Sequence, residues 1–304
     1  MKILFVGVSS FTGYHFVKKL SENKKNKITC TLTKNFNSYN SIKFERLKLI
    51  KNNKNINLIN KTKFGDKKFI QLLIKNKFDI ICLHHALTKN YNSNLKFNLK
   101  KSLIENTRNI ETVFKIIDRK TSVIVSNTVF QKIKSKNYES VNNYGISKSI
   151  SYDKIKHFCK KYKLKYKSIF ITNPWGTLEE KKLNFYLIKK WIENKNPIIS
   201  HPNYIRDNIY IDKLSKLYKK IVLSKSNKIE YFPSGICSTN KVFIEAFKKK
   251  FEQFFNKKVK VTYSNKASYD QPICRINGNK ISRKVKIKQN LNKYFLYYQR
   301  KLTN

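Results

Sequence analysis

Short apolar runs, separated by stretches with helical spacing, dominate the first half of the chain. Five of these runs have the length and composition of buried strands, namely Ile3–Val6, Lys27–Thr33, Ile56–Ile59, Asp79–Ala86 and Ser122–Val129. A parallel strand that is covered on both faces is apolar along its whole length, and a crossover segment joins it to the next strand. The pattern therefore predicts an α/β fold with a doubly wound parallel sheet.

Apolar residues at helical spacing predict helices between and beyond these strands. The helices are expected at Tyr14–Leu20, Phe44–Leu49, Lys67–Lys75, Leu99–Ile117, Tyr144–Tyr162 and Lys241–Phe255. One more strand is expected in the C-terminal part, at Lys258–Tyr263. With 304 residues the chain is long enough for one large domain or two smaller ones.

The first thirteen residues, MKILFVGVSSFTG, predict a strand, a tight turn and the start of a helix. Gly7 lets the chain turn sharply, and Gly13 lets the helix pack closely against the strand. The free N–H groups and the dipole of a helix N-terminus favour a phosphate. Ser10 replaces the middle glycine of the usual dinucleotide fingerprint. Taken alone, the turn therefore fits a dinucleotide loop and an ordinary strand-to-helix turn equally well.

The net charge of +48 is large but says little about function. Nucleic-acid readers favour arginine, whereas only seven of the 66 basic residues here are arginines, and the lysines are spread over the whole chain. We therefore expect no specific nucleic-acid partner, only weak, salt-sensitive adhesion to polyanions. In such a composition each arginine, and each of the seven glycines, is a candidate for a specific role.

The cysteine and hydropathy patterns predict a cytoplasmic protein. Five cysteines are scattered along the chain without a CxxC spacing, which favours reduced thiols over a disulfide framework or a zinc site. No apolar run reaches the roughly 18 residues of a membrane span. The apolar start, Ile3–Val8, is shorter than a signal peptide and lacks a small-residue cleavage site.

Two positions bear on the choice of cofactor. The second strand ends in Thr33 and Lys34 instead of the acidic residue that binds a ribose hydroxyl in NAD-preferring sites. A lysine there suits the extra phosphate of NADP, which slightly favours NADP over NAD, although lysine is abundant everywhere. Asp66 fits two roles, a contact to the adenine amine or a simple helix cap, and the cap is the favoured one.

The strand DIICLHHA ends in His84, His85 and Ala86. Adjacent residues of a strand point to opposite faces, and no third ligand is spaced nearby, so packing near a cofactor is favoured over a metal site. Ligands of doubly wound sheets bind at the carboxyl ends of the strands. Gly7, His84 and Ser126 all lie at such ends.

Tyr144 and Lys148 are four residues apart in a predicted helix, which places them on one helix face. The lysine ammonium and a cationic nicotinamide ring would favour the phenolate and lower the tyrosine pKa from about 10 toward neutrality. Ser126, at the preceding strand end, is placed to hold a substrate oxygen. With 18 tyrosines in the chain such a pair is weak evidence alone, but its order after the phosphate loop and the serine strengthens it.

In this order the stretches resemble the extended short-chain dehydrogenases/reductases, specifically the NAD(P)-dependent epimerase/dehydratase family that acts on nucleotide sugars. The matching stretches are GVSSFTGYHFV (7–17), DIICLHHA (79–86), SVIVSNTVF (122–130), YGISK (144–148), ITNPWG (171–176) and RDNIYIDKL (206–214). They span most of the chain. The resemblance implies a Rossmann-like NAD(P)-binding domain and a smaller C-terminal substrate-binding portion.

The resemblance also implies roles for single residues. Tyr144 would be the catalytic acid/base, Lys148 would lower its pKa and bind the nicotinamide ribose, and Ser126 would orient the reacting oxygen. The pyrophosphate loop would comprise Gly7, Ser9, Ser10, Phe11, Thr12 and Gly13. Further cofactor contacts are expected at Thr33, Lys34, Asp66, His84 and Ala86.

The second half of the chain carries candidate substrate contacts. Asn173, in Asn-Pro-Trp-Gly, resembles the start of the family turn that leads into the substrate domain. Arg206 resembles the arginine that meets the nucleotide diphosphate, and Arg275 fits a second such arginine or an ordinary surface ion pair. We expect residues 1–172 to form the NAD(P)-binding domain, with 205–219 returning to it, and 173–304 to form the smaller domain.

The expected activity is hydride exchange at a carbon of a nucleotide-activated sugar. The sequence leaves open an epimerase and an NADPH-dependent keto-sugar reductase. A dehydratase is disfavoured, because Asn127 and Thr128 follow Ser126 where similar dehydratases carry an Asp-Glu pair. The alternative of another class is a non-catalytic dinucleotide-binding or polyanion-binding protein, which would need none of the three catalytic residues. A homodimer is expected by resemblance only.

Overall fold

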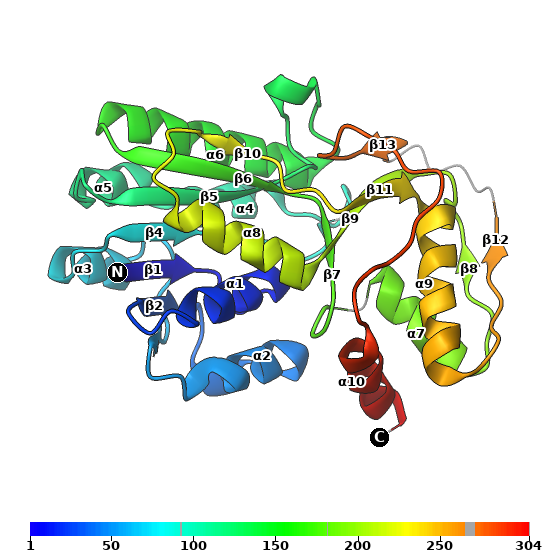
Figure 1. Ribbon diagram of the computed structural model, residues 1–304. Helices are drawn as coiled ribbons and strands as arrows, with labels where there is room; N and C mark the ends of the chain where they lie inside the picture. Colours follow the sequence, from blue (N-terminus) through cyan, green and yellow to red (C-terminus); the bar gives the residue numbers. More distant parts are fainter. Residues whose placement is uncertain (92, 181, 265–270, 304) are drawn as a thin grey trace. The chain divides into compact units, whose positions relative to one another are not determined.

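The structure is a computed structural model that describes residues 1–91, 93–180, 182–264 and 271–303 (Figure 1). The chain divides into two compact units. Unit 1 comprises Met1–Ile171 and Ser215–Pro233, and unit 2 comprises Thr172–Leu214 and Ser234–Asn304. Among the described residues, no helix is both long enough and apolar enough to cross a membrane.

A seven-stranded parallel sheet forms the centre of unit 1, in the order β10-β6-β5-β4-β1-β2-β3. Its strands are β1 (Lys2–Val6), β2 (Lys27–Thr31), β3 (Ile56–Ile59), β4 (Ile80–Leu83), β5 (Ser122–Thr128), β6 (Lys165–Ile171) and β10 (Glu230–Tyr231). Every neighbouring pair is parallel. Strand order reverses between β1 and β4, so the predicted Rossmann-like, doubly wound α/β fold is confirmed.

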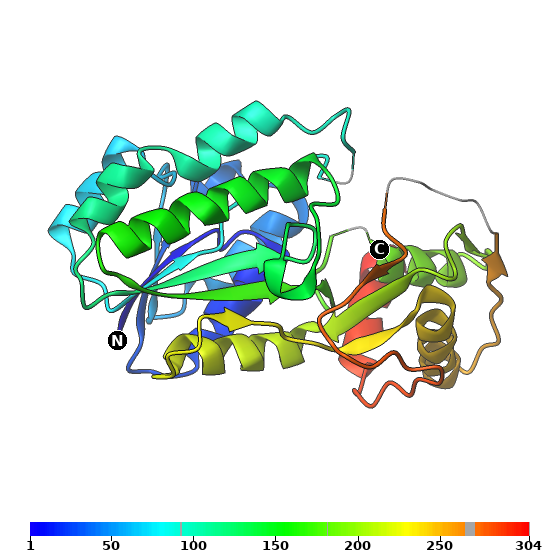
Figure 2. The same ribbon diagram turned by 90° about the horizontal axis from the view of Figure 1, so that it is seen from above.

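Helices cover both faces of this sheet (Figures 1 and 2). They are α1 (Phe11–Ser21), α2 (Ser41–Lys51), α3 (Lys67–Lys75), α4 (Leu99–Thr107), α5 (Ile110–Ile116), α6 (Asn143–Lys161) and α8 (Ile211–Leu223). Helices α3, α5 and α6 share one apolar core with the sheet, for example through Phe69, Phe114 and Ile155. On the opposite face, Phe16 of α1 stacks on Tyr218 of α8 with 3.8 Å between ring centres.

Unit 1 departs from the sequence prediction in four places. Strands β6 and β10 extend the sheet beyond the five expected strands. Strand β2 ends at Thr31 instead of Thr33, and β4 ends at Leu83 instead of Ala86. The helix expected over Leu99–Ile117 is two helices, because Asn109 adopts a left-handed conformation with φ 45°. The chain bends there around Gly65: a Cβ on Gly65 would lie 1.8 Å from the Arg108 carbonyl oxygen.

Unit 2 is built on a small sheet around β9 (Ile205–Tyr210), which pairs with three other strands. These are β7 (Asn173–Trp175), β11 (Ile236–Thr239) and β13 (Cys274–Arg275). The other elements are β8 (Ile198–Ile199), β12 (Thr262–Tyr263), α7 (Leu183–Ile192), α9 (Asn240–Phe255) and α10 (Asn292–Thr303). Aromatic side chains such as Trp175, Phe247 and Tyr294 fill the core between these helices.

The path of the chain between the units differs from the expected one. Residues 205–219 were expected to return to the first domain. Of these, 205–214 belong to unit 2, where 205–210 form β9, and 215–219 belong to unit 1. The returning segment is Ser215–Pro233, which supplies most of α8 and the edge strand β10. The strand expected over Lys258–Tyr263 is reduced to β12. The assignment of cofactor binding to one unit and substrate binding to the other stays a prediction.

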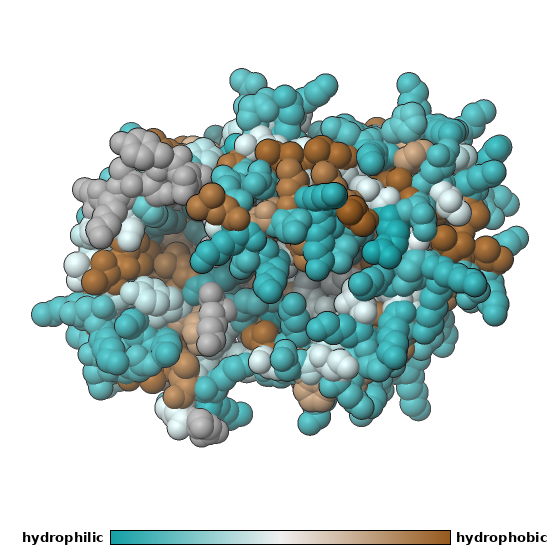
Figure 3. All heavy atoms as spheres, turned by 180° about the vertical axis from the view of Figure 1, so that it is seen from behind, coloured by the Kyte–Doolittle hydropathy of each residue, from teal (hydrophilic) through white to brown (hydrophobic). Residues whose placement is uncertain are grey.

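Hydrophilic residues cover most of the face shown in Figure 3, with small hydrophobic areas between them. The lysines that give the chain its charge of +48 are distributed along the whole sequence. Long lysine side chains keep their charged ends in water while their stems cover apolar surface. This distribution agrees with a dispersed charge and not with one concentrated basic block.

Candidate active site

Two glycines allow the turn between β1 and α1 to pass close to β4. Gly7 has φ +103°, and a Cβ there would lie 2.7 Å from the carbonyl oxygen of His84. A Cβ on Gly13 would lie 2.3 Å from the carbonyl oxygen of Gly7. A side chain at either position would therefore push the loop away from the end of the sheet.

Ser10 closes the same loop through its hydroxyl group. It is the N-cap of α1: its Oγ accepts a hydrogen bond from the N–H of Gly13 at 3.1 Å and donates one to the Gly7 carbonyl at 2.9 Å. Its φ of −72° is an ordinary value, so no glycine is required at this position. The backbone N–H groups of Phe11 and Thr12 begin α1, where a helix end favours an anion.

His84 ties this loop to the end of β4. Its Nε2 lies 2.8 Å from the Thr12 hydroxyl, and its ring packs against Phe5 and Phe16. Burial, followed by the charge of Lys148, lowers the pKa of His84 to about 3, so the ring is neutral at physiological pH. Its Nδ1 is buried without a hydrogen-bond partner among the described residues.

His85 points to the other face of the sheet, as the alternation along the strand predicts. Its ring stacks on Phe64 at 4.5 Å, and its Nε2 lies 3.3 Å from the Asn106 carbonyl. Burial lowers its pKa to about 4. The part of the chain that the structure describes holds no group of three His, Cys, Asp or Glu side chains able to bind a metal ion.

Arg46, in α2, reaches the same loop and was not singled out by the sequence analysis. It is 0% exposed, and its NH1 group donates a 3.1 Å hydrogen bond to the Ser9 carbonyl. Local motifs could not find it, because it lies more than 30 residues beyond the loop. The signal that could have found it was the rarity of arginine among the basic residues.

The expected adenosine contacts lie near the ends of β2 and β3. The Thr33 N–H and hydroxyl both lie 3.1 Å from the Tyr39 hydroxyl, and Lys34 is exposed. Asp66 caps α3: its two carboxylate oxygens accept hydrogen bonds from the N–H groups of Phe69 and Lys63, at 2.7 and 2.8 Å. The geometry thus shows the cap role. Ala86 is half-buried beyond β4.

Helix α6 carries Tyr144 and Lys148 to the carboxyl end of β5. The Asn142 side chain caps this helix, and a Cβ on Gly145 would lie 2.0 Å from the Phe130 carbonyl oxygen, so the helix approaches the chain after β5 very closely. Lys148 is 7% exposed, and its Nζ donates a 2.8 Å hydrogen bond to the Ser126 carbonyl. This bond joins the helix to the strand end that carries Ser126.

The environments of the tyrosine and the lysine shift their pKa values in opposite senses. The Tyr144 ring makes edge contacts with Tyr91, Phe97 and Phe130, at 5.7, 5.9 and 6.5 Å between ring centres. Burial, and next the Tyr91 phenol, raise its pKa above the usual value. Burial lowers the pKa of Lys148 to about 8. The expected lowering of the tyrosine pKa requires both the lysine ammonium and a cationic nicotinamide ring, and it stays a prediction for the complex with the cofactor.

The residues around Ser126 carry hydroxyl and amide groups. Ser126 and Tyr218 are both buried, and neither hydroxyl has a hydrogen-bond partner among the described residues. Burial raises the pKa of Tyr218. Asn127 is also buried, and neither atom of its amide has a hydrogen-bond partner among the described residues. The Thr128 hydroxyl accepts a bond from the Phe130 N–H at 3.3 Å. No carboxyl group stands at these three positions.

In unit 2, strand pairing brings two arginines side by side. Arg275 of β13 lies directly opposite Arg206 of β9 in a parallel register. The Arg206 guanidinium donates to the carbonyls of Ile205 and Ile273, both at 2.9 Å. Its pKa is lowered by burial first and by the Arg275 charge among the smaller causes. Like charges on opposed positions are unfavourable, so the pair is suited to an anion.

Asp207 holds the strands that present these arginines. It is 0% exposed, and its carboxylate accepts hydrogen bonds from the N–H groups of Gly235 (2.6 Å), Asn277 (3.0 Å) and Gly278 (3.3 Å). The aspartate beside Arg206 therefore has a structural role. Asn173, the other expected substrate contact, is half-buried on β7 and lies opposite Asn208 of β9.

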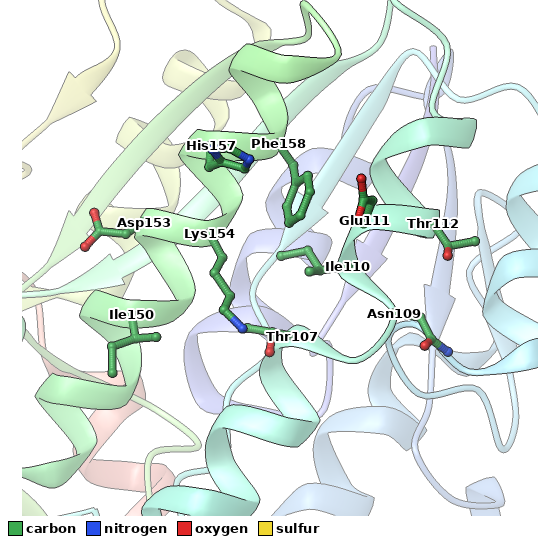
Figure 4. A pocket seen from close by; sticks show the side chains of 10 residues that line it. All are labelled: Thr107, Asn109, Ile110, Glu111, Thr112, Ile150, Asp153, Lys154, His157 and Phe158. Atoms are coloured by element: carbon green, nitrogen blue, oxygen red, sulfur yellow. The ribbon is translucent and has the colours of Figure 1, made fainter.

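A separate pocket of ≈ 760 Å³ lies in unit 1, away from these residues (Figure 4). Its walls are the outer side of α6 and the stretch that runs from the end of α4 into the first turn of α5. The lining residues are Thr107, Asn109, Ile110, Glu111, Thr112, Ile150, Asp153, Lys154, His157 and Phe158. None of the candidate catalytic or cofactor residues lines it.

Solved structures of similar fold cover the whole chain. A UDP-glucuronic acid 4-epimerase from Bacillus cereus, in complex with UDP-glucuronic acid and NAD, has a TM-score of 0.74 and 16% identity, with 99% of both chains covered. A UDP-glucose 4-epimerase from Thermotoga maritima, with UDP-glucose, has a TM-score of 0.72 and 18% identity, with 100% of both chains covered. At such identities the likeness shows the fold alone.

A dehydratase shares this fold as well. The dTDP-glucose 4,6-dehydratase from Bacillus anthracis, in complex with NAD, has a TM-score of 0.74 and 15% identity, and the match covers 99% of this chain and 97% of the dehydratase. No curated protein matches the sequence significantly. The model of the NAD dependent epimerase/dehydratase family matches residues 3–231. The chain therefore belongs to the NAD-dependent epimerase/dehydratase family.

Proposed function

We propose that this protein is an NAD(P)-dependent enzyme that exchanges a hydride at a ring carbon of a nucleotide-activated sugar, with Tyr144 as the general acid/base. The observation that carries the proposal is the 2.8 Å hydrogen bond from Lys148 Nζ to the Ser126 carbonyl. It fixes the helix of Tyr144 at the carboxyl end of β5, in the same sheet whose β1 and β4 ends carry the glycine loop and His84.

The loop after β1 fits a dinucleotide. Gly7 and Gly13 keep it close to the sheet, and the N–H groups of Phe11 and Thr12 begin α1, where a pyrophosphate would be favoured. The cofactor would supply the hydride acceptor and donor. The exposed Lys34 after β2 supports a slight preference for NADP, whereas similar solved structures hold NAD.

Tyr144 would take the proton of the sugar hydroxyl while the hydride leaves the same carbon, and would return it in the reverse step. Its raised pKa keeps the phenol protonated in the protein alone, so the site must supply positive charge to form the phenolate. Lys148, one helical turn away and ionised below about pH 8, provides such a charge. Ser126 would orient the reacting oxygen.

An epimerase and a reductase use the same residues in different ways. An epimerase returns the hydride to the opposite face of the keto intermediate, whereas a reductase performs one half of the reaction. Dehydration requires an acid and a base besides the tyrosine, and Asn127 and Thr128 supply neither. We therefore place the activity among the epimerases and reductases and not among the dehydratases.

The arginine pair of unit 2 would bind the diphosphate of the substrate. Arg206 and Arg275 are neighbours on paired strands, and two guanidinium groups match a doubly charged diphosphate. Asn173 would contact the sugar or the same diphosphate.

The proposal is tested with the purified full chain and a panel of UDP- and dTDP-linked sugars and keto-sugars. Each is incubated with NAD⁺, NADP⁺ or NADPH, and the products are identified by NMR. An inverted ring carbon without net cofactor consumption would establish an epimerase, and stoichiometric NADPH oxidation with a keto-sugar would establish a reductase. Dinucleotide binding without turnover of any sugar would contradict the proposal and favour a non-catalytic binding protein.

A further inference from the structure

Arg46 is a fully buried cation beside the dinucleotide loop. Its side chain is 0% exposed, and NH1 donates a 3.1 Å hydrogen bond to the carbonyl of Ser9. The guanidinium carbon lies 5.7 Å from the centre of the Phe11 ring. The guanidinium thus contacts Ser9 and Phe11, the two neighbours of Ser10. Ser10 is the position at which this loop departs from the glycine fingerprint.

A buried charge lowers the stability of the fold unless hydrogen bonds or an opposite charge offset its loss of hydration. Most cations of this chain are lysines, and Lys43 and Lys48, on the same helix α2 as Arg46, are exposed. A planar guanidinium donates hydrogen bonds at its edge while its face packs on an aromatic ring, which an ammonium cannot do. The contacts to Ser9 and Phe11 use both properties.

Side chains from three elements restrain the loop. Ser10 at the start of α1 bonds Gly7 and Gly13, and His84 after β4 bonds Thr12. Arg46 of α2 is the partner that brings a full positive charge. A guanidinium on the Ser9 carbonyl offsets the partial negative charge of that oxygen, which would otherwise repel a pyrophosphate at the neighbouring N–H groups.

We propose that Arg46 is a positioning residue of the dinucleotide site, which fixes the Ser9 carbonyl and adds positive potential beneath the pyrophosphate. The inference rests on the proposed function, since it assumes that this loop binds a dinucleotide. Arg46 acts through the loop and not by direct contact, because its side chain has no exposed surface. A direct contact to the 2′-phosphate would discriminate NADP from NAD, whereas a charge beneath the pyrophosphate strengthens the binding of both.

The test measures dissociation constants for NADH and NADPH from nicotinamide fluorescence, which requires no turnover. Arg46→Met, which keeps much of the apolar volume, should weaken both dinucleotides by about tenfold, because the charge and its hydrogen bond are lost. Arg46→Lys keeps the charge but loses the planar contact, and should weaken both by about threefold. Arg119→Met, at an exposed arginine of the same unit, is the matched control and should bind as the wild type does.

Thermal unfolding of each variant, followed by circular dichroism without dinucleotide, separates binding from folding. A lower melting temperature with unchanged dissociation constants would assign Arg46 a purely structural role and overturn the proposal. Weakened binding of NADPH alone would also overturn it, since it would indicate direct contact with the 2′-phosphate. If Arg46→Met does not fold, Arg46→Lys decides, and wild-type affinity in that variant overturns the proposal. Wild-type protein that binds neither dinucleotide would overturn the proposed function as well.

Discussion

The two units present their candidate site residues in different ways. In unit 1, Tyr144 and Lys148 lie on the 19-residue helix α6, and the hydrogen bond from Lys148 to the Ser126 carbonyl joins that helix to the end of β5. In unit 2, Arg206 and Arg275 lie on a six-residue strand and a two-residue strand. What holds those strands is the buried carboxylate of Asp207, which binds backbone N–H groups of two other segments.

This difference bears on how the candidate residues of each unit respond to mutation. The position of Tyr144 follows from one long helix and its close approach at Gly145, so loss of the tyrosine hydroxyl alone should leave the helix in place. The position of the arginine pair depends on three hydrogen bonds to one carboxylate, so a change outside the pair disturbs it. The two units should therefore separate chemistry from substrate binding in experiments.

The largest effect is expected when the ammonium group of Lys148 in unit 1 is removed. Lys148→Met should lower kcat by about 1000-fold, because the phenolate of Tyr144 loses its neighbouring ammonium. In the wild-type protein kcat/KM should fall as the pH rises through about 8, where Lys148 loses its proton. Steady-state rates across pH measure both effects, and Lys154→Met, at an exposed lysine of the same helix, is the control. Wild-type kcat in the Lys148 variant would contradict the assigned role.

The next effect concerns the carboxylate of unit 2. Asp207→Ala leaves three backbone N–H groups without their acceptor and should destabilise unit 2 by about 3 kcal/mol. Both tryptophans, Trp175 and Trp191, belong to unit 2, so denaturant unfolding followed by tryptophan fluorescence reports on this unit. Dinucleotide affinity should stay at its wild-type value while nucleotide-sugar affinity falls. Equal losses of both affinities would contradict the assignment of substrate contacts to unit 2 and dinucleotide contacts to unit 1.

A smaller effect is expected for Arg206, the proposed contact to the substrate diphosphate. Arg206→Ala should raise the KM for the nucleotide sugar by about tenfold or more and change the KM for the dinucleotide far less, because only the diphosphate contact is lost. Arg283→Ala, at an exposed arginine of the same unit, controls for the loss of net charge. If both Michaelis constants rise equally, Arg206 does not belong to the substrate site.

The last effect is a gradual pH dependence of stability within unit 2. Glu179 is 2% exposed and accepts a 2.9 Å hydrogen bond from Tyr294; burial raises its pKa to about 8. The folded state thus binds this proton more tightly than the unfolded state. The resulting stability is complete below the ordinary carboxyl pKa of 4.5 and is lost as the pH rises through about 8, at no more than about 1.4 kcal/mol per pH unit.

Glu179→Gln, which stays neutral at every pH, should remove this dependence. Unfolding monitored by tryptophan fluorescence between mildly acidic and alkaline pH gives the comparison. A stability of the wild-type protein that stays flat over this range would contradict a protonated Glu179.

Much of unit 1 could be predicted because its signals are local. The apolar run of β1, the glycines at 7 and 13 and the four-residue spacing of Tyr144 and Lys148 lie within single elements. The break at Asn109 could not be predicted, because it arises where the chain meets Gly65, about 40 residues away in sequence. Strand β10 has two residues, too few to produce a pattern.

The residues that sequence reasoning missed act over long separations in the chain. Arg46 contacts Ser9 across 37 positions, and the Asp207 carboxylate meets Asn277 across 70. No sequence motif links residues at separations of this size. The burial of Tyr144 could not be predicted from its spacing to Lys148 either, and in the folded protein this burial raises the pKa of the tyrosine.

The most direct test of the account follows the near-ultraviolet absorbance of reduced nicotinamide in a single turnover. A nucleotide sugar that the panel identifies as substrate is mixed with an excess of enzyme and NAD⁺ or NADP⁺. If the enzyme is a reductase, the reduced sugar product is used in place of the substrate, so that the reaction runs in the oxidative direction. The account predicts that the band grows with wild-type protein, and that Tyr144→Phe binds the same dinucleotide with similar affinity but forms the band at least 1000-fold more slowly, or not at all. Hydride transfer at the wild-type rate in that variant would contradict the central role of Tyr144.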